Sequence, residues 1–416
     1  MKKILIDALK AIKPTKEEER EVLNRVDSIL SRINKRLVYA KAVLGGSGAK
    51  GTWLKDVNDA DIFVCFDYKK YKDKDKTISD ILEKVLEKEF KNVDRLYGSR
   101  DYFQIKQKNF TFEMVPILAI KKAEEAKNIT DVSPLHAKWV GKYKKLADEI
   151  RLTKQFCKAA DVYGAESYIK GFSGYVCEIL TIYYGGFLSL MRNAAKWKEK
   201  ATIDPENYYK NRDILDEMNK SKTNSPLVII DPVQADRNAA AALGKEKFDR
   251  FKSSCKNFLK KPSKSFFEIK EITTDSLKKK AKNKELMILE VNPKTGKVDV
   301  VGSKLLKSLE FLNKKLAEWD FKIIECGWEW NKKDKALFYF ILDKAVLPPK
   351  KIHIGPPIKA KNHVESFKKK YKETFISKGR VYARIKREFR KPKELIIKLI
   401  SDPYLKEKAE KVKIIG

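Results

Sequence analysis

The chain has 416 residues, enough for two or three domains that each bury a core of their own. Its 91 Lys and Arg residues outnumber 57 Asp and Glu residues, and the net charge of +34 favours a polyanionic partner, although a lysine-rich proteome can produce part of that excess. Five cysteines without C-x-x-C spacing and only three histidines predict a reduced, intracellular protein that has no zinc site. No apolar run approaches the ~20 residues of a membrane span, so we expect a cytoplasmic protein with no membrane partner.

The first part of the chain combines one long helix with short strands. Thr15 and Glu18 form a T-x-x-E capping box, and apolar residues at a three-to-four spacing then predict an amphipathic helix as far as Leu37. Patterns typical of β-strands follow, with a helical stretch between the second and third of them. The predicted strands cover residues 38–44, 62–66, 102–107 and 110–120, and the helical stretch covers 79–91. This pattern predicts a small α+β domain.

The pattern changes twice in the rest of the chain. From about residue 147 to 259 it is mainly helical, and we expect Gly164 to be the C-cap of the first long helix. Beyond residue 263 the order is strand, helix, strand, strand, which predicts an RRM-like or ferredoxin-like sheet. The final stretch is rich in lysine.

Three glycines, Gly46, Gly48 and Gly51, spell G-x-G-x-x-G after an apolar run. A dinucleotide-binding turn of this kind must be followed by a helix of about a dozen residues before the next parallel strand. Only the polar segment TWLKDVND separates Gly51 from the next strand-like run, and no G-x-x-x-x-G-K-[ST] motif is present. Both the Rossmann and the Walker A interpretations therefore fail.

Acidic residues follow this turn. Asp59 and Asp61 are two residues apart at the start of a predicted strand, so their carboxylates point to the same face and repel each other. A short acidic pair is by itself most often a solvated turn, but Mg²⁺ bound by one or two carboxylates and by substrate phosphate oxygens would relieve the repulsion. A third acid, Glu113, lies on the face of a later strand opposite its apolar neighbours. A G-S turn, an acidic pair and a third acid on a later strand resemble the arrangement of polymerase β-type nucleotidyltransferases.

Longer motifs narrow this resemblance. The segments GGSGAKGTWLKDVNDADIFVCF, FEMVP, SPLHAKWV, GAESYIKGFSGYVCEIL and IIDPVQADRNAAAAL occur in this order. Together they resemble the archaeal-type CCA-adding enzymes, which are the class I tRNA nucleotidyltransferases. The similarity is close over roughly residues 10–260 and loose over the remainder.

The resemblance implies a fold and an activity. The fold has a polymerase β-like nucleotidyltransferase palm domain at 1–145, a helical domain at 146–262 that shapes the nucleotide pocket, and an RRM-like basic domain at 263–416. The activity is addition of C, C and A to the 3′ end of tRNA from CTP and ATP, without a nucleic-acid template and with release of pyrophosphate. The cofactor is Mg²⁺, and the partner is the acceptor stem and 3′ end of tRNA.

The resemblance also implies roles for single residues. The catalytic metal ligands are Asp59, Asp61 and Glu113, and the nucleotide-contacting residues are Gly46, Ser47, Lys50, Ser133, His136, Lys154, Tyr163 and Arg237. Two positions depart from the family pattern. Glu113 stands where an aspartate is usual, and Lys50 stands where the family often has an arginine, so the charge is kept but the bidentate fork is lost.

Simpler interpretations exist for several of these residues. Without the motifs, His136 suits a structural histidine, Lys154 a solvated helical face, Tyr163 a core aromatic and Arg237 a brace for its own loop. Two other functions are also open, namely a related transferase that makes oligo(A) or poly(A), and an RNA-binding homologue without activity. The oligomeric state stays open, with a homodimer among the options.

Overall fold

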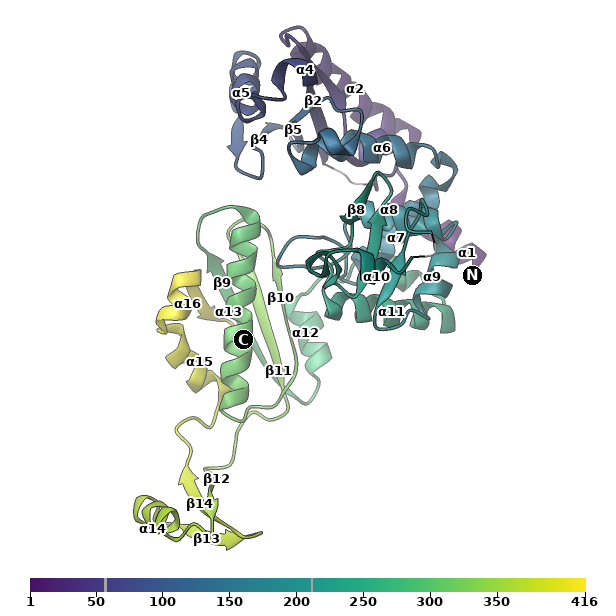
Figure 1. Ribbon diagram of the computed structural model, residues 1–416. Helices are drawn as coiled ribbons and strands as arrows, with labels where there is room; N and C mark the ends of the chain where they lie inside the picture. The colour runs from purple at the N-terminus through teal and green to yellow at the C-terminus, as the bar shows by residue number, and fades with distance from the viewer. Residues whose placement is uncertain (56–57, 211) are drawn as a thin grey trace. The chain divides into compact units, whose positions relative to one another are not determined.

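The computed structural model describes residues 1–55, 58–210 and 212–416 (Figure 1). The chain forms two compact units, Met1–Lys270 and Glu271–Gly416. All the residues to which the sequence analysis assigns metal binding or nucleotide contact lie in the first unit.

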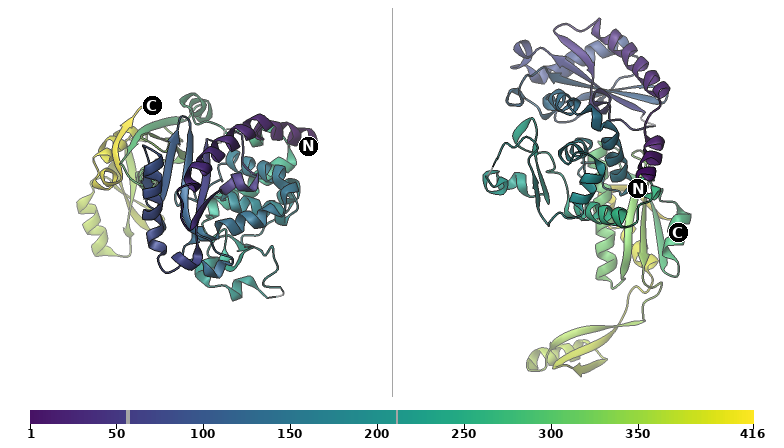
Figure 2. Two further views of the ribbon diagram at one scale, coloured as in Figure 1. Left: turned by 90° about the horizontal axis from the view of Figure 1, so that it is seen from above. Right: turned by 90° about the vertical axis from the view of Figure 1, so that its right-hand side faces the viewer.

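A five-stranded sheet organises the N-terminal part of the first unit, with the order β1-β2-β5-β4-β3. The strands β2 and β5 are parallel, and the other neighbours are antiparallel. The helices α2 (Lys16–Asn34) and α5 (Ile78–Glu89) cover one face of this sheet (Figures 1 and 2). The strands are β1 (Ala40–Leu44), β2 (Asp59–Phe66), β3 (Asp94–Leu96), β4 (Tyr102–Gln107) and β5 (Phe110–Leu118).

The predicted capping box at the start of α2 is confirmed. The backbone N–H of Glu18 donates to Thr15 Oγ1 at 3.2 Å, and the backbone N–H of Thr15 donates to Glu18 Oε2 at 2.8 Å. Two donors of the first helical turn are thereby satisfied, which orients α2 for packing against the sheet. Short helices and turns connect the strands and lead into the next part of the unit. These are α3 (Gly46–Lys50), α4 (Tyr68–Tyr71), η1 (Asp75–Thr77), η2 (Ala123–Glu125), η3 (Ile129–Val132), α6 (Ser133–Gly141) and η4 (Lys144–Leu146).

The second part of the first unit is mainly helical. Its core is aromatic, since the ring of Phe156 contacts the rings of Phe187, Phe251 and Phe258. The N-terminal helix α1 (Lys2–Ile12) also packs into this core. The other elements are α7 (Ala147–Ala159), α8 (Gly174–Tyr183), α9 (Phe187–Ala194), β6 (Ala201–Ile203), α10 (Ile214–Glu217), η5 (Lys220–Thr223), β7 (Leu227–Asp231), β8 (Gln234–Asn238), α11 (Lys245–Lys260) and η6 (Lys264–Phe267).

Gly164 does not cap the first long helix, so that prediction is wrong. The helix α7 ends at Ala159, and the residue that turns the chain is Asp161, with φ of 55°. The backbone N–H of Val162 donates to the carbonyl of Cys157 at 2.9 Å, which is the hydrogen bond of a Schellman motif. Asp takes the left-handed conformation more readily than most residues, and the Asp161 carboxylate binds Lys247 and Arg250 of α11.

The second unit contains the predicted ferredoxin-like sheet. Its order is β10-β11-β9-β15, and all neighbours are antiparallel. The helices α13 (Val298–Glu318), α15 (Pro392–Ile400) and α16 (Pro403–Lys408) pack on one face. The strands are β9 (Glu285–Pro293), β10 (Ile323–Trp330), β11 (Ala336–Leu342) and β15 (Ala409–Ile414).

Two features of this unit were not predicted. The helix α12 (Thr274–Ala281) packs on the second face of the sheet, where Leu277 and Ala281 contact Ile288, Tyr339 and Ile341. A separate three-stranded sheet of order β12-β14-β13, with one helix, is inserted between β11 and α15. Its elements are β12 (Lys350–Pro357), α14 (Lys361–Lys370), β13 (Thr374–Ser377) and β14 (Arg380–Lys386).

Among the described residues, no single helix has the length and apolar composition needed to cross a membrane. The helices α8 and α9 reach that length only together, and they are bent by 93° at their junction. Both contribute buried side chains to the core of the first unit.

Candidate active site

Three acidic side chains lie on one face of the five-stranded sheet. In the parallel pairing of β2 with β5, Asp61 lies directly opposite Glu113, and Asp59 lies two residues before Asp61 on the same face. The neighbouring residues Ile62 and Met114 point to the other face, into the core beneath α2 and α5. The alternation predicted for β5 is thereby confirmed, and it places Glu113 on the face opposite Met114.

The surroundings of Asp61 on this face disfavour the ionised form of its carboxylate. Burial raises the pKa of Asp61 to about 6, the carboxylates of Glu113 and Asp59 add to the rise, and the charge of Lys50 opposes it. Glu113 Oε1 accepts a hydrogen bond from Gln104 Nε2 at 2.7 Å. Within the described ranges, no three or more His, Cys, Asp or Glu side chains are already gathered closely enough to enclose a metal ion. The donor set is nevertheless all oxygen and mutually repulsive, which fits a hard divalent cation.

A turn between β1 and β2 brings the glycine motif to these carboxylates. Gly46 has φ of 53°, and a Cβ at this position would overlap the Asp61 carboxylate. The backbone N–H of Gly45 donates to the Asp61 carbonyl at 2.7 Å. Glycine is therefore required at residue 46 because the backbone of α3 passes directly over the acidic face. Ser47 is the next residue of this helix.

Lys50, at the end of α3, meets a buried carboxylate from the helical part. Its Nζ donates to Glu178 Oε2 at 2.8 Å, while Lys154 Nζ of α7 donates to Glu178 Oε1 at 2.7 Å. Thr52 Oγ1 also donates to Glu178 Oε1, at 2.8 Å. Burial alone would raise the pKa of Glu178, but Lys154 and Lys50 lower it to about 2, so the carboxylate is ionised.

Tyr163 lies beside this cluster. A Cβ at Gly174 would come within 2.8 Å of the Tyr163 hydroxyl and 3.7 Å of Lys154 Cε, which places the three residues together. Burial is the main cause that raises the pKa of Tyr163, so its hydroxyl keeps its proton and can donate a hydrogen bond.

A second buried carboxylate, Asp231 at the end of β7, gathers the remaining predicted residues. His136 Nε2 lies 3.1 Å from Asp231 Oδ2, Arg237 donates to the same oxygen, and the Tyr175 hydroxyl donates to Oδ1 at 3.2 Å. Burial raises the pKa of Asp231, but the hydrogen bond and the charge of His136, with smaller contributions from Val233 and Arg237, lower it below its usual value. Arg237 thus has an ionised partner.

Aromatic contacts join the two carboxylate clusters. The rings of His136 and Tyr175 are stacked with centroids 4.0 Å apart, and Lys50 Nζ lies 5.1 Å from the Tyr175 ring centroid. Ser133 begins α6, one turn before His136. The structure therefore brings Gly46, Ser47, Lys50, Ser133, His136, Lys154, Tyr163 and Arg237 to one region next to Asp59, Asp61 and Glu113.

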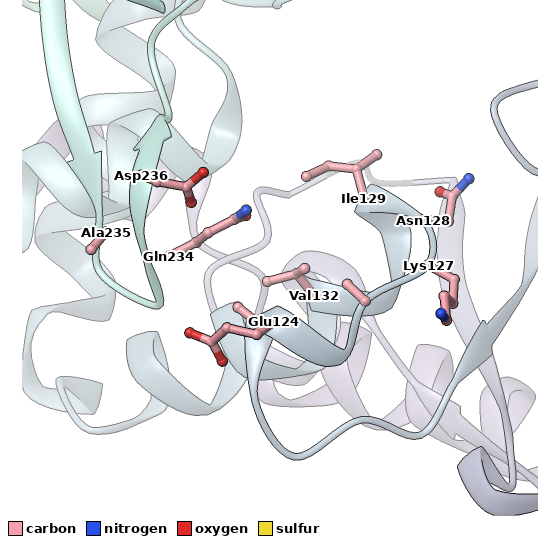
Figure 3. Close-up of a pocket in the computed structure, with 10 residues that line it drawn as sticks. Glu124, Lys127, Asn128, Ile129, Val132, Gln234, Ala235 and Asp236 are labelled. Carbon is pink, nitrogen blue, oxygen red and sulfur yellow. The ribbon is translucent and has the colours of Figure 1, made fainter. Parts of the chain in front are cut away.

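A pocket of about 580 Å³ adjoins these residues, between the loop 123–132 and the β7–β8 turn (Figure 3). Its lining carries the carboxylates of Glu124 and Asp236 and a single cation, Lys127. This charge does not suit a triphosphate, which is better matched by Lys50 and Lys154. The lining residues are Ala123, Glu124, Ala126, Lys127, Asn128, Ile129, Val132, Gln234, Ala235 and Asp236.

Two buried carboxylates that bind several of the predicted site residues, Glu178 and Asp231, were not themselves predicted. Glu178 is the only charged residue of the apolar helix GYVCEILTIY, and an ionisable side chain in such a helix signals a paired, buried charge. Asp231 lies inside the motif IIDPVQADRN, yet only its arginine was singled out. Asp101 immediately precedes β4 and is the acidic residue that would be considered for the third metal ligand if Glu113 did not serve. It is bound to Arg95 through contacts of 2.8 and 3.0 Å.

Family models match three parts of the chain. Residues 23–133 match the nucleotidyltransferase domain, 148–268 the second domain of tRNA nucleotidyltransferase, and 287–405 the C-terminal domain of the CCA-adding enzyme. Among solved structures, a Cid1 poly(U) polymerase with bound Mg 3′-dATP has a TM-score of 0.52 and 16% identity, covering 64% of this chain and 98% of that one. The fold and the acidic site together define a polymerase β-like nucleotidyltransferase.

Curated relatives identify the particular family. The CCA-adding enzyme of Nanoarchaeum equitans is 36% identical, over 90% of this chain and 91% of that protein. The CCA-adding enzyme of Methanosarcina barkeri is 31% identical, over 92% of this chain and 85% of that protein. The chain belongs to the archaeal-type CCA-adding enzymes.

Proposed function

We propose that the acidic face of β2 and β5, with the lysines and the Asp231 cluster beside it, is the site at which this chain adds all three nucleotides of CCA to tRNA. CCA addition to the 3′ end of tRNA is the activity of the family to which the chain belongs. The observation that carries the assignment of the site is the pairing of Asp61 with Glu113 beneath the Gly46 turn.

Asp59, Asp61 and Glu113 hold Mg²⁺ in this proposal. Their oxygen donors suit this ion, and burial together with the neighbouring carboxylates of Glu113 and Asp59 raises the pKa of Asp61, which a bound cation would oppose. Bound Mg²⁺ would activate the terminal ribose hydroxyl of tRNA and neutralise the triphosphate and the pyrophosphate that leaves. Glu113 reaches one methylene further than the usual aspartate, and Gln104 orients its carboxylate.

Lys50, Ser47 and the backbone at Gly46 hold the triphosphate. The α3 turn lies over Asp61, so phosphates bound along it are placed next to the carboxylates. Lys154 and Tyr163 add donors from the helical part, where the Tyr163 hydroxyl keeps its proton. These contacts orient the α-phosphorus for attack, which is the main contribution a protein makes to this reaction.

Arg237, His136 and Ser133 contact the nucleotide near its base. A guanidinium only donates hydrogen bonds, so Arg237 matches the unprotonated ring nitrogens of cytosine and adenine, whereas UTP and GTP present N–H at the corresponding ring position. Asp231 holds both Arg237 and His136, which fixes the direction of the donors. The basic second unit then holds the acceptor stem through phosphate and shape contacts, which carry no sequence requirement.

The test uses tRNA that lacks its 3′ CCA, Mg²⁺, and each labelled nucleotide alone and in combination. We expect C and CC products with CTP alone, complete CCA with CTP and ATP together, and no addition with UTP or GTP. Products that contain only A would favour the oligo(A) or poly(A) alternative. No product with any nucleotide, from a protein that still binds tRNA, would favour the inactive homologue.

A further inference from the structure

Glu178 has no role in the chemistry described above, yet it is a buried carboxylate that binds two lysines of the candidate site. Its side chain is 1% exposed and accepts hydrogen bonds from Lys50, Lys154 and Thr52 at 2.7–2.8 Å. An ionised carboxylate this deeply buried is retained only when it is fully paired. In this structure two cations and one hydroxyl surround the single anion.

The two lysines come from different parts of the first unit. Lys50 ends α3 of the nucleotidyltransferase part, and Lys154 lies on α7 of the helical part. Their side chains are only 11% and 5% exposed, so neither ammonium group can turn freely into solvent. Two ammonium groups on a single carboxylate leave one net positive charge, held in a fixed place.

That charge faces the acidic site. Lys50 ends the five-residue helix α3, whose first residue, Gly46, packs directly against the Asp61 carboxylate. Lys154 also donates to Thr52 Oγ1 at 2.9 Å, in the segment that follows the Gly46 turn. A triphosphate bound beside Asp61 would lie next to α3 and so within the field of this net charge.

We propose that Glu178 is a positioning residue for the triphosphate, because it fixes the ammonium groups of Lys50 and Lys154 and offsets their mutual repulsion before the nucleotide binds. This inference rests on the proposed nucleotide site. Glu178 itself does not touch the nucleotide, and it acts through the two lysines.

The principal variant is Glu178→Gln, which keeps the size of the side chain and removes its charge. We expect the Kd for labelled CTP, measured by equilibrium dialysis without tRNA, to rise about tenfold or more, a loss of ~1.4 kcal/mol for each factor of ten. In single-turnover addition, the half-saturating CTP concentration should rise by a similar factor, whereas the rate at saturation and the affinity for tRNA change about twofold or less. The Kd for CTP is measured without tRNA, so it tests the positioning role of Glu178 even if the protein adds no nucleotide to tRNA. The inference and the proposed function are therefore tested separately.

A double-variant cycle separates positioning from a general structural role. If Glu178 acts through Lys50, then Glu178→Gln in a Lys50→Gln background should weaken CTP binding much less than it does in the wild type. Thr181→Val is the matched control, because Thr181 is a buried polar residue of the same helix that binds Thr153 at 2.8 Å. It should lower stability without changing the Kd for CTP.

If Glu178→Gln does not fold, Glu178→Asp is the variant to use in the same measurement. It keeps the charge but withdraws the carboxylate by one methylene, so it cannot reach both lysines, and we expect the Kd for CTP to rise about threefold or more. A wild-type Kd in folded Glu178→Gln or Glu178→Asp would overturn the proposal. The proposal would also be overturned if the effects of Glu178→Gln and Lys50→Gln on the Kd for CTP multiplied fully in the double variant. An equal rise of this Kd in Thr181→Val would overturn it as well.

Discussion

The raised pKa of Asp61 makes the stability of the protein depend on pH. This pKa is raised from 3.8 to about 6 in the folded protein, so the folded state loses stability as pH rises through this interval, and the full loss is present above it. We expect Asp61→Asn to stabilise the protein without metal by about 2–3 kcal/mol at pH 8 and by less than about 1 kcal/mol at pH 4.5. Urea unfolding in EDTA at the two pH values measures this. A gain that does not change with pH would contradict the explanation.

Substitution of Glu113 tests whether this residue is the third metal ligand. Glu113→Gln removes the charge without changing the reach, and we expect addition to fall by about a hundredfold or more while tRNA affinity is retained. The matched control is Asp101→Asn, because Asp101 is paired with Arg95 and should affect stability rather than addition. Near-normal addition by Glu113→Gln would transfer the role to Asp101.

Substitution of Arg237 tests whether this residue recognises the base of the incoming nucleotide. Removing its donors should weaken use of CTP and ATP and reduce their advantage over UTP and GTP by about one to two factors of ten, since an unpaired buried donor costs ~1–3 kcal/mol. Single-turnover addition of all four nucleotides by Arg237→Ala, to tRNA ending before CCA, in C and in CC, measures the ratio. An equal slowing of all four would instead assign Arg237 to the phosphates or to the scaffold.

At the scale of elements, the approach to α6 depends on one buried carboxylate. Asp131 accepts hydrogen bonds from the backbone N–H groups of Leu118, Lys127 and Asn128, and it is paired with buried Arg100. These contacts join the end of β5 to η3 and so place Ser133 at the start of α6.

Loss of this carboxylate should be severe. We expect Asp131→Asn to lower the free energy of unfolding by about 3–5 kcal/mol, because it leaves the Arg100 charge buried without its main counter-charge. Asp213→Asn, at the exposed N-cap of α10, should change it by less than about 1 kcal/mol. Urea denaturation compares the two variants, and equal small effects would show that Asp131 does not support α6.

The ferredoxin-like sheet shows that an element order does not determine which surface is open. In an RRM, aromatic side chains on one sheet face stack against bases. Here that face is covered by α12, and Tyr339 is 6% exposed beneath it. If this unit binds RNA as proposed, its basic surface is the better candidate, and α14 ends in Lys368, Lys369 and Lys370.

At the scale of the whole molecule, the net charge of +34 predicts binding that depends steeply on salt. If the three lysines at the end of α14 contact tRNA phosphates, replacing all three with Gln should reduce the slope of log K against log salt by about 2–3. The addition rate at saturating tRNA should not change. Filter binding over a salt series measures the slope, and an unchanged slope would place the RNA on another surface.

Much of the local structure and the position of the acidic site could be predicted from short-range patterns. The capping box at Thr15 and the alternation around Glu113 depend on neighbouring residues, and both agree with the structure. The predicted order strand, helix, strand, strand in the second unit also agrees with it. The family motifs extended this prediction to residues far apart in the chain, such as Lys50 and Arg237, whose roles stay predictions.

Only the tertiary structure decided how the charged groups are paired. Glu178 and Asp231 each bind cations or donors from distant segments. Asp161, which turns the chain after α7 in place of Gly164, binds Lys247 and Arg250 of α11. The sequence determined which residues share a face, since that follows from the local period of a helix or strand. Which buried charges meet depends on how whole elements pack, because a carboxylate excluded from water is stable only where distant segments bring it a counter-charge.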